Sequence, residues 1–177
     1  MCYNRAMEWE KITNIILIAS FAVLAIFVVL GITQWISRGS LKKVDKQLLY
    51  MPIPLVLMLV VYLVCDKLLP NLFPGLMPTR PDGSGEPSFP STHVMVVATI
   101  FFVVITALPK YIKSKPLRIF FEIALLVLTS LVATGRIMAN KHTVIDVIGA
   151  VIFAFIFTEI YHQCIKKHKV NKEPNHE

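Results

Sequence analysis

The sequence predicts an all-α protein that crosses a membrane about five times, and its composition and its apolar runs carry that prediction. Hydrophobic residues make up 55% of the 177 residues and charged residues only 16%, against roughly a quarter charged in soluble domains. A helix needs about 20 mostly apolar residues to cross the hydrocarbon core. Five such runs are present, at residues 12–36, 48–69, 93–109, 118–135 and 144–164. We therefore expect residues 1–177 to form a single integral membrane domain.

The positive charges indicate how these spans are oriented. The net charge is +7, with 18 basic residues in all. Five spans would put three basic segments on one face: Arg38, Lys42, Lys43 and Lys46; Lys110, Lys113, Lys115 and Arg118; and Lys166, Lys167, Lys169 and Lys172. The opposite face would carry the six remaining basic residues. Because Lys and Arg concentrate on the cytoplasmic side of a cell membrane, we expect the tail at 166–177 to be cytoplasmic and the N-terminus to lie outside. The basic surplus is then a topology signal, and no nucleic-acid partner is expected.

The first outward loop, residues 70–92, is rich in Pro and Gly, which excludes regular structure. Its Arg80 has a simple alternative role, since interfacial arginines reach toward lipid headgroups. The third span then opens with Ser91, Thr92 and His93. Ser91 or Thr92 is expected to be the N-cap, whose side-chain oxygen accepts a bond from the first turn. A helix N-terminus also attracts anions, and His93 adds a titratable donor beside it.

The second outward loop brings Arg136, Lys141 and His142 close to Asp146 in the next span. His142 and Asp146 are four residues apart, so they lie on one face of a helix. A carboxylate there can accept from one imidazole nitrogen and leave the other free to attack or to transfer a proton. An ionisable residue in an apolar span marks a functional site by default. A purely structural polar pair is the alternative interpretation.

At these residues the sequence resembles the type 2 phosphatidic acid phosphatase family, membrane relatives of the vanadium haloperoxidases. The family signatures are Lys-x6-Arg-Pro, Pro-Ser-Gly-His and Ser-Arg-x5-His-x3-Asp. The matching segments here are Arg80-Pro81, then Pro90-Ser91-Thr92-His93, and then Gly135-Arg136 with His142 and Asp146. The chain departs from the signatures at three positions, with Phe73 for the lysine, Thr92 for glycine and Gly135 for serine.

The resemblance implies a phosphatase that needs neither a metal nor a cofactor. His142 would be the nucleophile that forms a phosphohistidine, Asp146 would orient it, and His93 would protonate the leaving oxygen. The phosphoryl oxygens would be held by Arg80, Ser91, Thr92 and Arg136. Because Phe73 replaces the family lysine, we expect Lys141 to supply the missing cation. Phosphoryl transfer depends mostly on such positioning and charge stabilisation.

The resemblance also implies a substrate in the lipid bilayer, a lipid phosphate or diphosphate. Undecaprenyl diphosphate is the first candidate and phosphatidylglycerol phosphate the second, with the site outside the cytoplasm. Two alternatives remain: a lipid-phosphate-binding protein that has lost activity, which the missing lysine permits, and a small transporter. The two histidines and Asp146 favour the enzyme, while the apolar spans offer a transporter almost no polar path.

Overall fold

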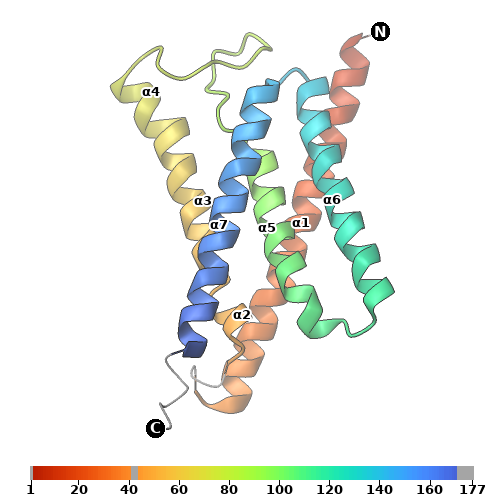
Figure 1. The fold of residues 1–177 in the computed structure, drawn as a ribbon. Coiled ribbons are helices and arrows are strands. Elements are labelled where there is room, and N and C mark those ends of the chain that lie inside the picture. The colour runs from red at the N-terminus through yellow and green to blue at the C-terminus, as the bar shows by residue number, and fades with distance from the viewer. Residues whose placement is uncertain (1, 41–43, 171–177) are drawn as a thin grey trace.

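The computed structural model describes residues 2–40 and 44–170, and the regular structure in these ranges is helical apart from one isolated bridge between Thr79 and Pro87. The elements are α1 (Cys2–Arg38), α2 (Lys46–Leu49), α3 (Pro52–Tyr62), η2 (Leu63–Leu68), α4 (Leu69–Leu72), α5 (Thr92–Tyr111), α6 (Lys115–Met138) and α7 (Val144–Val170). Figure 1 shows the long helices side by side in one bundle, with the start of α1 and the end of α7 at opposite ends of it. The predicted all-α class is confirmed.

Five helical segments are long and apolar enough to cross a membrane, as predicted. They are Ala6–Arg38, Lys46–Leu72, Thr92–Tyr111, Lys115–Met138 and Val144–Lys167. All of them extend beyond the predicted runs, since polar residues at the ends continue the helices toward the interface. The helix α7 runs to Val170, so the first part of the predicted tail at 166–177 is helical, and residues 171–177 lie outside the described residues.

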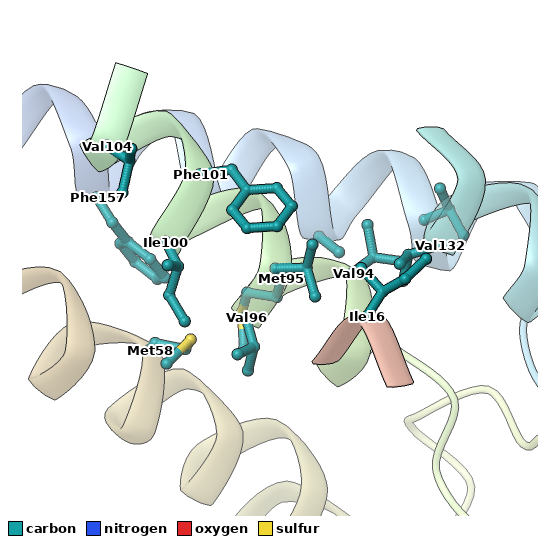
Figure 2. Packing of buried hydrophobic residues seen from close by; sticks show 13 residues of the cluster. Ile16, Met58, Val94, Met95, Val96, Ile100, Phe101, Val104, Val132 and Phe157 are labelled. Carbon is teal, nitrogen blue, oxygen red and sulfur yellow. The ribbon is translucent and has the colours of Figure 1, made fainter. Parts of the chain in front are cut away.

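The helix α5 occupies the centre of the bundle. In its apolar window 67% of the residues are buried, against 6% in α1 and 11% in α6. Figure 2 shows side chains of α5 meeting those of the other four spans, with Ile16 from α1, Met58 from α3, Val132 from α6 and Phe157 from α7. Lipid tails are as apolar as these side chains, so close packing holds such helices together. The first turn of α5 is therefore held in a fixed place.

The loop between α4 and α5 lies at the same end of the bundle as the turn between α6 and α7 (Figure 1). Main-chain bonds close this Pro- and Gly-rich loop, from Arg80 N–H to the Glu86 carbonyl at 2.8 Å and from Ser88 N–H to the Pro78 carbonyl at 2.9 Å. Its tip turns through Gly83, whose φ of +79° favours glycine. The two outward loops predicted from the sequence therefore meet.

The second span contains a π-helical turn, η2, just before the loop. The N–H of Leu69 bonds to the Val64 carbonyl, five residues back, and Pro70 has no N–H with which to resume the α pattern. Such turns often occur at functional sites. This one carries Asp66 and Lys67 to the wall of the cavity described below.

A glycine on α7 admits the aromatic ring that anchors this loop. A Cβ at Gly149 would lie 2.2 Å from Cε2 of Phe89, whose ring also packs edge-on against Phe153. The loop therefore rests directly on the backbone of α7.

Replacing Gly149 with alanine should destabilise the protein, because the Phe89 ring must move out of a packed position. We expect a loss of about 1–3 kcal/mol, visible as a lower melting temperature in detergent. Gly31→Ala is the matched control, since its Cβ would meet Leu48 Cβ at an ordinary 3.5 Å. Equal melting temperatures for the two variants would contradict this packing.

Candidate active site

His142 is buried in the turn before α7, and a main-chain carbonyl orients its ring. The Nδ1–H group donates to the carbonyl of Ser88 at 2.8 Å. The nearest carboxylate oxygen, Oδ2 of Asp146, lies 4.0 Å from Nδ1. The sequence predicts that Asp146 accepts directly from this ring, whereas the structure gives that bond to Ser88. Nδ1 is occupied in either case, so Nε2 is the nitrogen left for chemistry.

Asp146 acts on the site through its neighbours. Its Oδ2 accepts from the N–H of Thr143 at 2.7 Å and from the Thr143 hydroxyl at 2.9 Å, and its own N–H donates back to that hydroxyl at 3.3 Å. This reciprocal arrangement is a capping box, which begins α7. The other oxygen, Oδ1, accepts from the Ser88 hydroxyl at 3.2 Å. The carboxylate thus holds the residue whose carbonyl orients His142.

The N-terminus of α5 faces the same place. Ser91 is its N-cap, as predicted, but the side chain makes no capping bond. The Ser91 N–H instead donates to the Asp146 carbonyl at 3.2 Å, which ties α5 to α7. Thr92 and His93 follow in the first turn and line a cavity beside it.

Three buried polar atoms at this end of the molecule have no hydrogen-bond partner among the described residues: Ser91 Oγ, Arg80 Nε and Arg136 Nε. Ser91 is fully buried and Arg136 is 3% exposed. An unpaired buried donor is costly in a folded protein. Ser91 is the N-cap of α5, and the charges of Arg80 and Arg136 act on His93 in its first turn. The three groups therefore suit the binding of an anion at this helix N-terminus.

A cavity of about 480 Å³ opens beside these groups. It is lined by Leu17, Phe21, Tyr62, Asp66, Lys67, Arg80, Glu86, Pro87, Thr92, His93, Val96 and His142. Its apolar residues Leu17, Phe21 and Val96 come from α1 and α5, and its charged residues come from η2 and the loop. Arg80 forms an ion pair with Glu86 at its edge.

Lys141 points to a different neighbour. Its ammonium lies 3.0 Å from Asp82 Oδ2, at the tip of the loop. Hydrogen bonds from Ser84 and the Lys141 ammonium hold the pKa of the Asp82 carboxyl well below its usual range. Lys141 thus ties the two loops together, and Lys67 is the lysine among the residues that line the cavity. The predicted contact of Lys141 with phosphate stays a prediction.

Comparison of the chain with family models and solved structures identifies its family. A model of the PAP2 superfamily matches residues 46–169, more than half of the chain. The chain belongs to the PAP2 superfamily. It is also similar to a solved structure, the first transmembrane PAP2 type phosphatidylglycerolphosphate phosphatase from Bacillus subtilis, with a TM-score of 0.64 and 23% identity over 92% of this chain and 77% of that one. At that identity the likeness shows the fold alone. No curated protein matches the chain.

Packing explains why this PAP2 protein has glycine at position 135, where the family signature has serine. A Cβ at Gly135 would lie 2.5 Å from Cγ2 of Thr13 and 3.2 Å from the ring of Trp9. The helix α1 therefore fills the space that the family serine would need. The next residue, Arg136, is buried in the last turn of α6.

The electrostatics keep the ring of His142 neutral in this PAP2 site. Burial, assisted by the positive charges of Arg136 and Arg80, lowers the pKa of the imidazole from 6.5 to about 4. The Ser88 carbonyl and the Asp146 carboxylate act in the opposite direction but less strongly. At neutral pH the ring therefore keeps an unprotonated nitrogen.

Sequence reasoning missed two residues of this PAP2 site and left the place of a third, Lys67, open. Ser88 contributes a carbonyl, which any residue possesses, so its side chain gave no signal. Asn14 bonds to His93 from α1, far away in the sequence. Lys67 depends on the π-helical turn for its place. The capping box was detectable, because Thr143-x-x-Asp146 has its spacing.

Lowering the pH should destabilise the protein through His142. The unfolded ring has its ordinary pKa of 6.5 and the folded ring one of about 4, so between these values the unfolded chain binds more protons. The contribution of neutral His142 to the free energy of unfolding is complete above about pH 6.5 and is lost as the pH falls toward 4. Melting temperatures in detergent should fall over this window, and more steeply for the wild type than for His142→Gln. Parallel curves would contradict the lowered pKa.

Proposed function

We propose that this PAP2 protein is a metal-independent membrane phosphatase that removes phosphate from a lipid phosphate or diphosphate. The observation that carries the proposal is a set of unpaired buried donors, Ser91 Oγ, Arg80 Nε and Arg136 Nε. Ser91 is the N-cap of α5, and the two arginines act electrostatically on His142. Two guanidinium groups and a helix N-terminus suit the equatorial oxygens of a phosphoryl group. Their positive charge can stabilise the transition state without a metal.

In the proposed first step, Nε2 of His142 attacks phosphorus. The P–O bond to the lipid breaks as the P–N bond of a phosphohistidine forms, and His93 gives its proton to the leaving oxygen. Water then attacks phosphorus, the P–N bond breaks, and His93 takes up the proton from water. The neutral ring of His142 supports the first step, because only an unprotonated nitrogen has an electron pair to attack with.

The apolar part of the cavity supports a lipid as the substrate. Leu17, Phe21 and Val96 line it next to His93, inside segments that are apolar enough to cross a membrane. A lipid whose hydrocarbon chain binds there would bring its phosphate to the two arginines. Undecaprenyl diphosphate is the first lipid that we propose, and phosphatidylglycerol phosphate is the second.

The orientation that we propose follows from the basic residues. The end of the bundle opposite the site carries Lys110, Lys113 and Lys115, at the end of α5, in the turn that follows and at the start of α6. Because cytoplasmic loops carry the excess of Lys and Arg, the site faces the outside of the cell membrane and the C-terminus the cytoplasm. A phosphatase in this position would act on lipids of the outer leaflet.

Replacing His142 with alanine should abolish phosphate release, by a factor on the order of 10³ or more, because binding groups cannot replace a nucleophile. Purified protein would be assayed in EDTA against a panel of lipid phosphates that includes both candidates. Brief incubation with ³²P-labelled substrate should label the wild type with a bond that is labile to acid and stable to base.

His162→Ala is the matched control, since this histidine lies on the same helix, α7, and away from the cavity. It should retain wild-type turnover and labelling. Labelling of His142→Ala, or a wild type that needs added Mg²⁺ after EDTA, would contradict the proposed mechanism.

We further propose Lys67, rather than Lys141, as the lysine nearest to the bound phosphate. Lys67 lines the cavity together with Arg80 and His142, and its ammonium pairs there with Asp66 at 2.9 Å. The Lys141 ammonium pairs with Asp82, and Lys141 is not among the residues that line this cavity. Lys67→Ala should lower kcat/KM by about 10-fold, the scale of one hydrogen bond to a charged group, and Lys141→Ala should lower it less. A larger loss for Lys141→Ala would return the role to that residue.

A further inference from the structure

The helix α1 reaches into the site with one polar side chain. Oδ1 of Asn14 lies 2.9 Å from Nε2 of His93. Asn14 lies outside residues 46–169, which the PAP2 model matches. This contact is therefore supplied by a helix that the family signatures do not include.

Tight packing fixes the level at which α1 passes the site. Thr13, next to Asn14, is fully buried, and its Cγ2 would lie 2.5 Å from a Cβ at Gly135. Ile16 joins the core cluster with Val94 of α5. A rotation or a shift of α1 would break these contacts, so Asn14 is held in register with His93.

The chemistry of the contact assigns the two ring nitrogens. An amide oxygen can only accept, so Nε2 of His93 must carry the hydrogen in this bond. The remaining nitrogen, Nδ1, is then the one that can gain or lose a proton. Because the amide is neutral, Asn14 can hold the ring in both protonation states without adding charge to the site.

We propose that Asn14 is a positioning residue for His93: its side-chain oxygen holds Nε2–H and makes Nδ1 the nitrogen that exchanges a proton with the substrate. This inference rests on the proposed phosphatase function. As the lipid P–O bond breaks, the proton moves from Nδ1 to the leaving oxygen. As water attacks the phosphohistidine, the proton of water returns to Nδ1 and the P–N bond breaks.

The charged and titratable groups that face His93 decide how a change at Asn14 would alter its protonation. Arg136 from α6, Arg80 from the loop and His142 from the α7 turn act on it electrostatically. Lys67, Asp66 and Glu86 line the same cavity. Among the described residues, the side chain that hydrogen-bonds to this ring is the neutral amide of Asn14.

The test compares two phosphate esters that differ in their need for an acid. An alkyl phosphate needs a proton on its leaving oxygen, whereas 4-nitrophenyl phosphate does not. In Asn14→Leu, kcat for the alkyl ester should fall about 10- to 100-fold, which is part of what general acid catalysis contributes. For the 4-nitrophenyl ester, kcat should fall less than about 3-fold. Equal losses for both esters, or none, would overturn the proposal.

Thr13→Val is the matched control, because Thr13 neighbours Asn14 and, among the described residues, its hydroxyl donates within α1, to the Glu10 carbonyl at 3.0 Å. It keeps the shape of the contact with Gly135 and should leave both esters near wild-type rates. If it shows the same ester-dependent loss, the effect comes from packing of α1 and the role of Asn14 is refuted.

Asn14→Asp provides a second variant that keeps an acceptor in place. The ratio of the kcat values for the two esters should stay within about 3-fold of the wild-type ratio. The basic limb of the pH–rate profile for the alkyl ester should move to higher pH, because a carboxylate stabilises the protonated ring. An unmoved limb would overturn the proposal, even if Asn14→Leu fails to fold. A wild type inactive on every ester and lipid phosphate would instead refute the phosphatase function itself.

Discussion

The buried carboxylate of Asp146 is the group on which the rest of the site depends. It is 1% exposed, and its two oxygens accept bonds from Ser88 and from Thr143. Its main-chain carbonyl accepts from Ser91 at the start of α5. A buried charge is tolerated only where such bonds replace water. Those same bonds join the loop, the turn that carries His142, and the central helix.

Close packing around α1 explains how this chain accommodates a departure from its family. Glycine at 135 allows the backbone of α6 to approach Thr13 and Trp9. The approach brings Asn14 to His93 and keeps Leu17 at the cavity wall. A helix outside the family match therefore forms part of the site. In a membrane such small-residue contacts let helix backbones come close enough to interact.

The proposed mechanism combines a neutral nucleophile, His142, with the permanent positive charge of two arginines. Arg80 and Arg136 disfavour a proton on His142, and burial does so more strongly. A phosphate entering this cavity would bring the negative charge that the two guanidinium groups and the N-terminus of α5 attract. Before it arrives, Glu86 pairs with Arg80 at the edge. In the proposed phosphatase the same cations would keep the ring able to attack and would hold the phosphate that it attacks.

The amino-acid sequence by itself determined the membrane spans, because their length and apolarity are properties of each segment alone. It also pointed to His142, His93, Arg80 and Arg136, whose charged or titratable side chains are rare in such a chain. The tertiary structure decided which groups touch. The Ser88 carbonyl replaced Asp146 as the acceptor for His142, and Asn14 came to His93 across 79 residues. Lys67 reached the cavity while Lys141 bonded to Asp82. A main-chain carbonyl is common to every residue, and the distance between two side chains depends on how helices pack, so neither can be read from residue type or spacing.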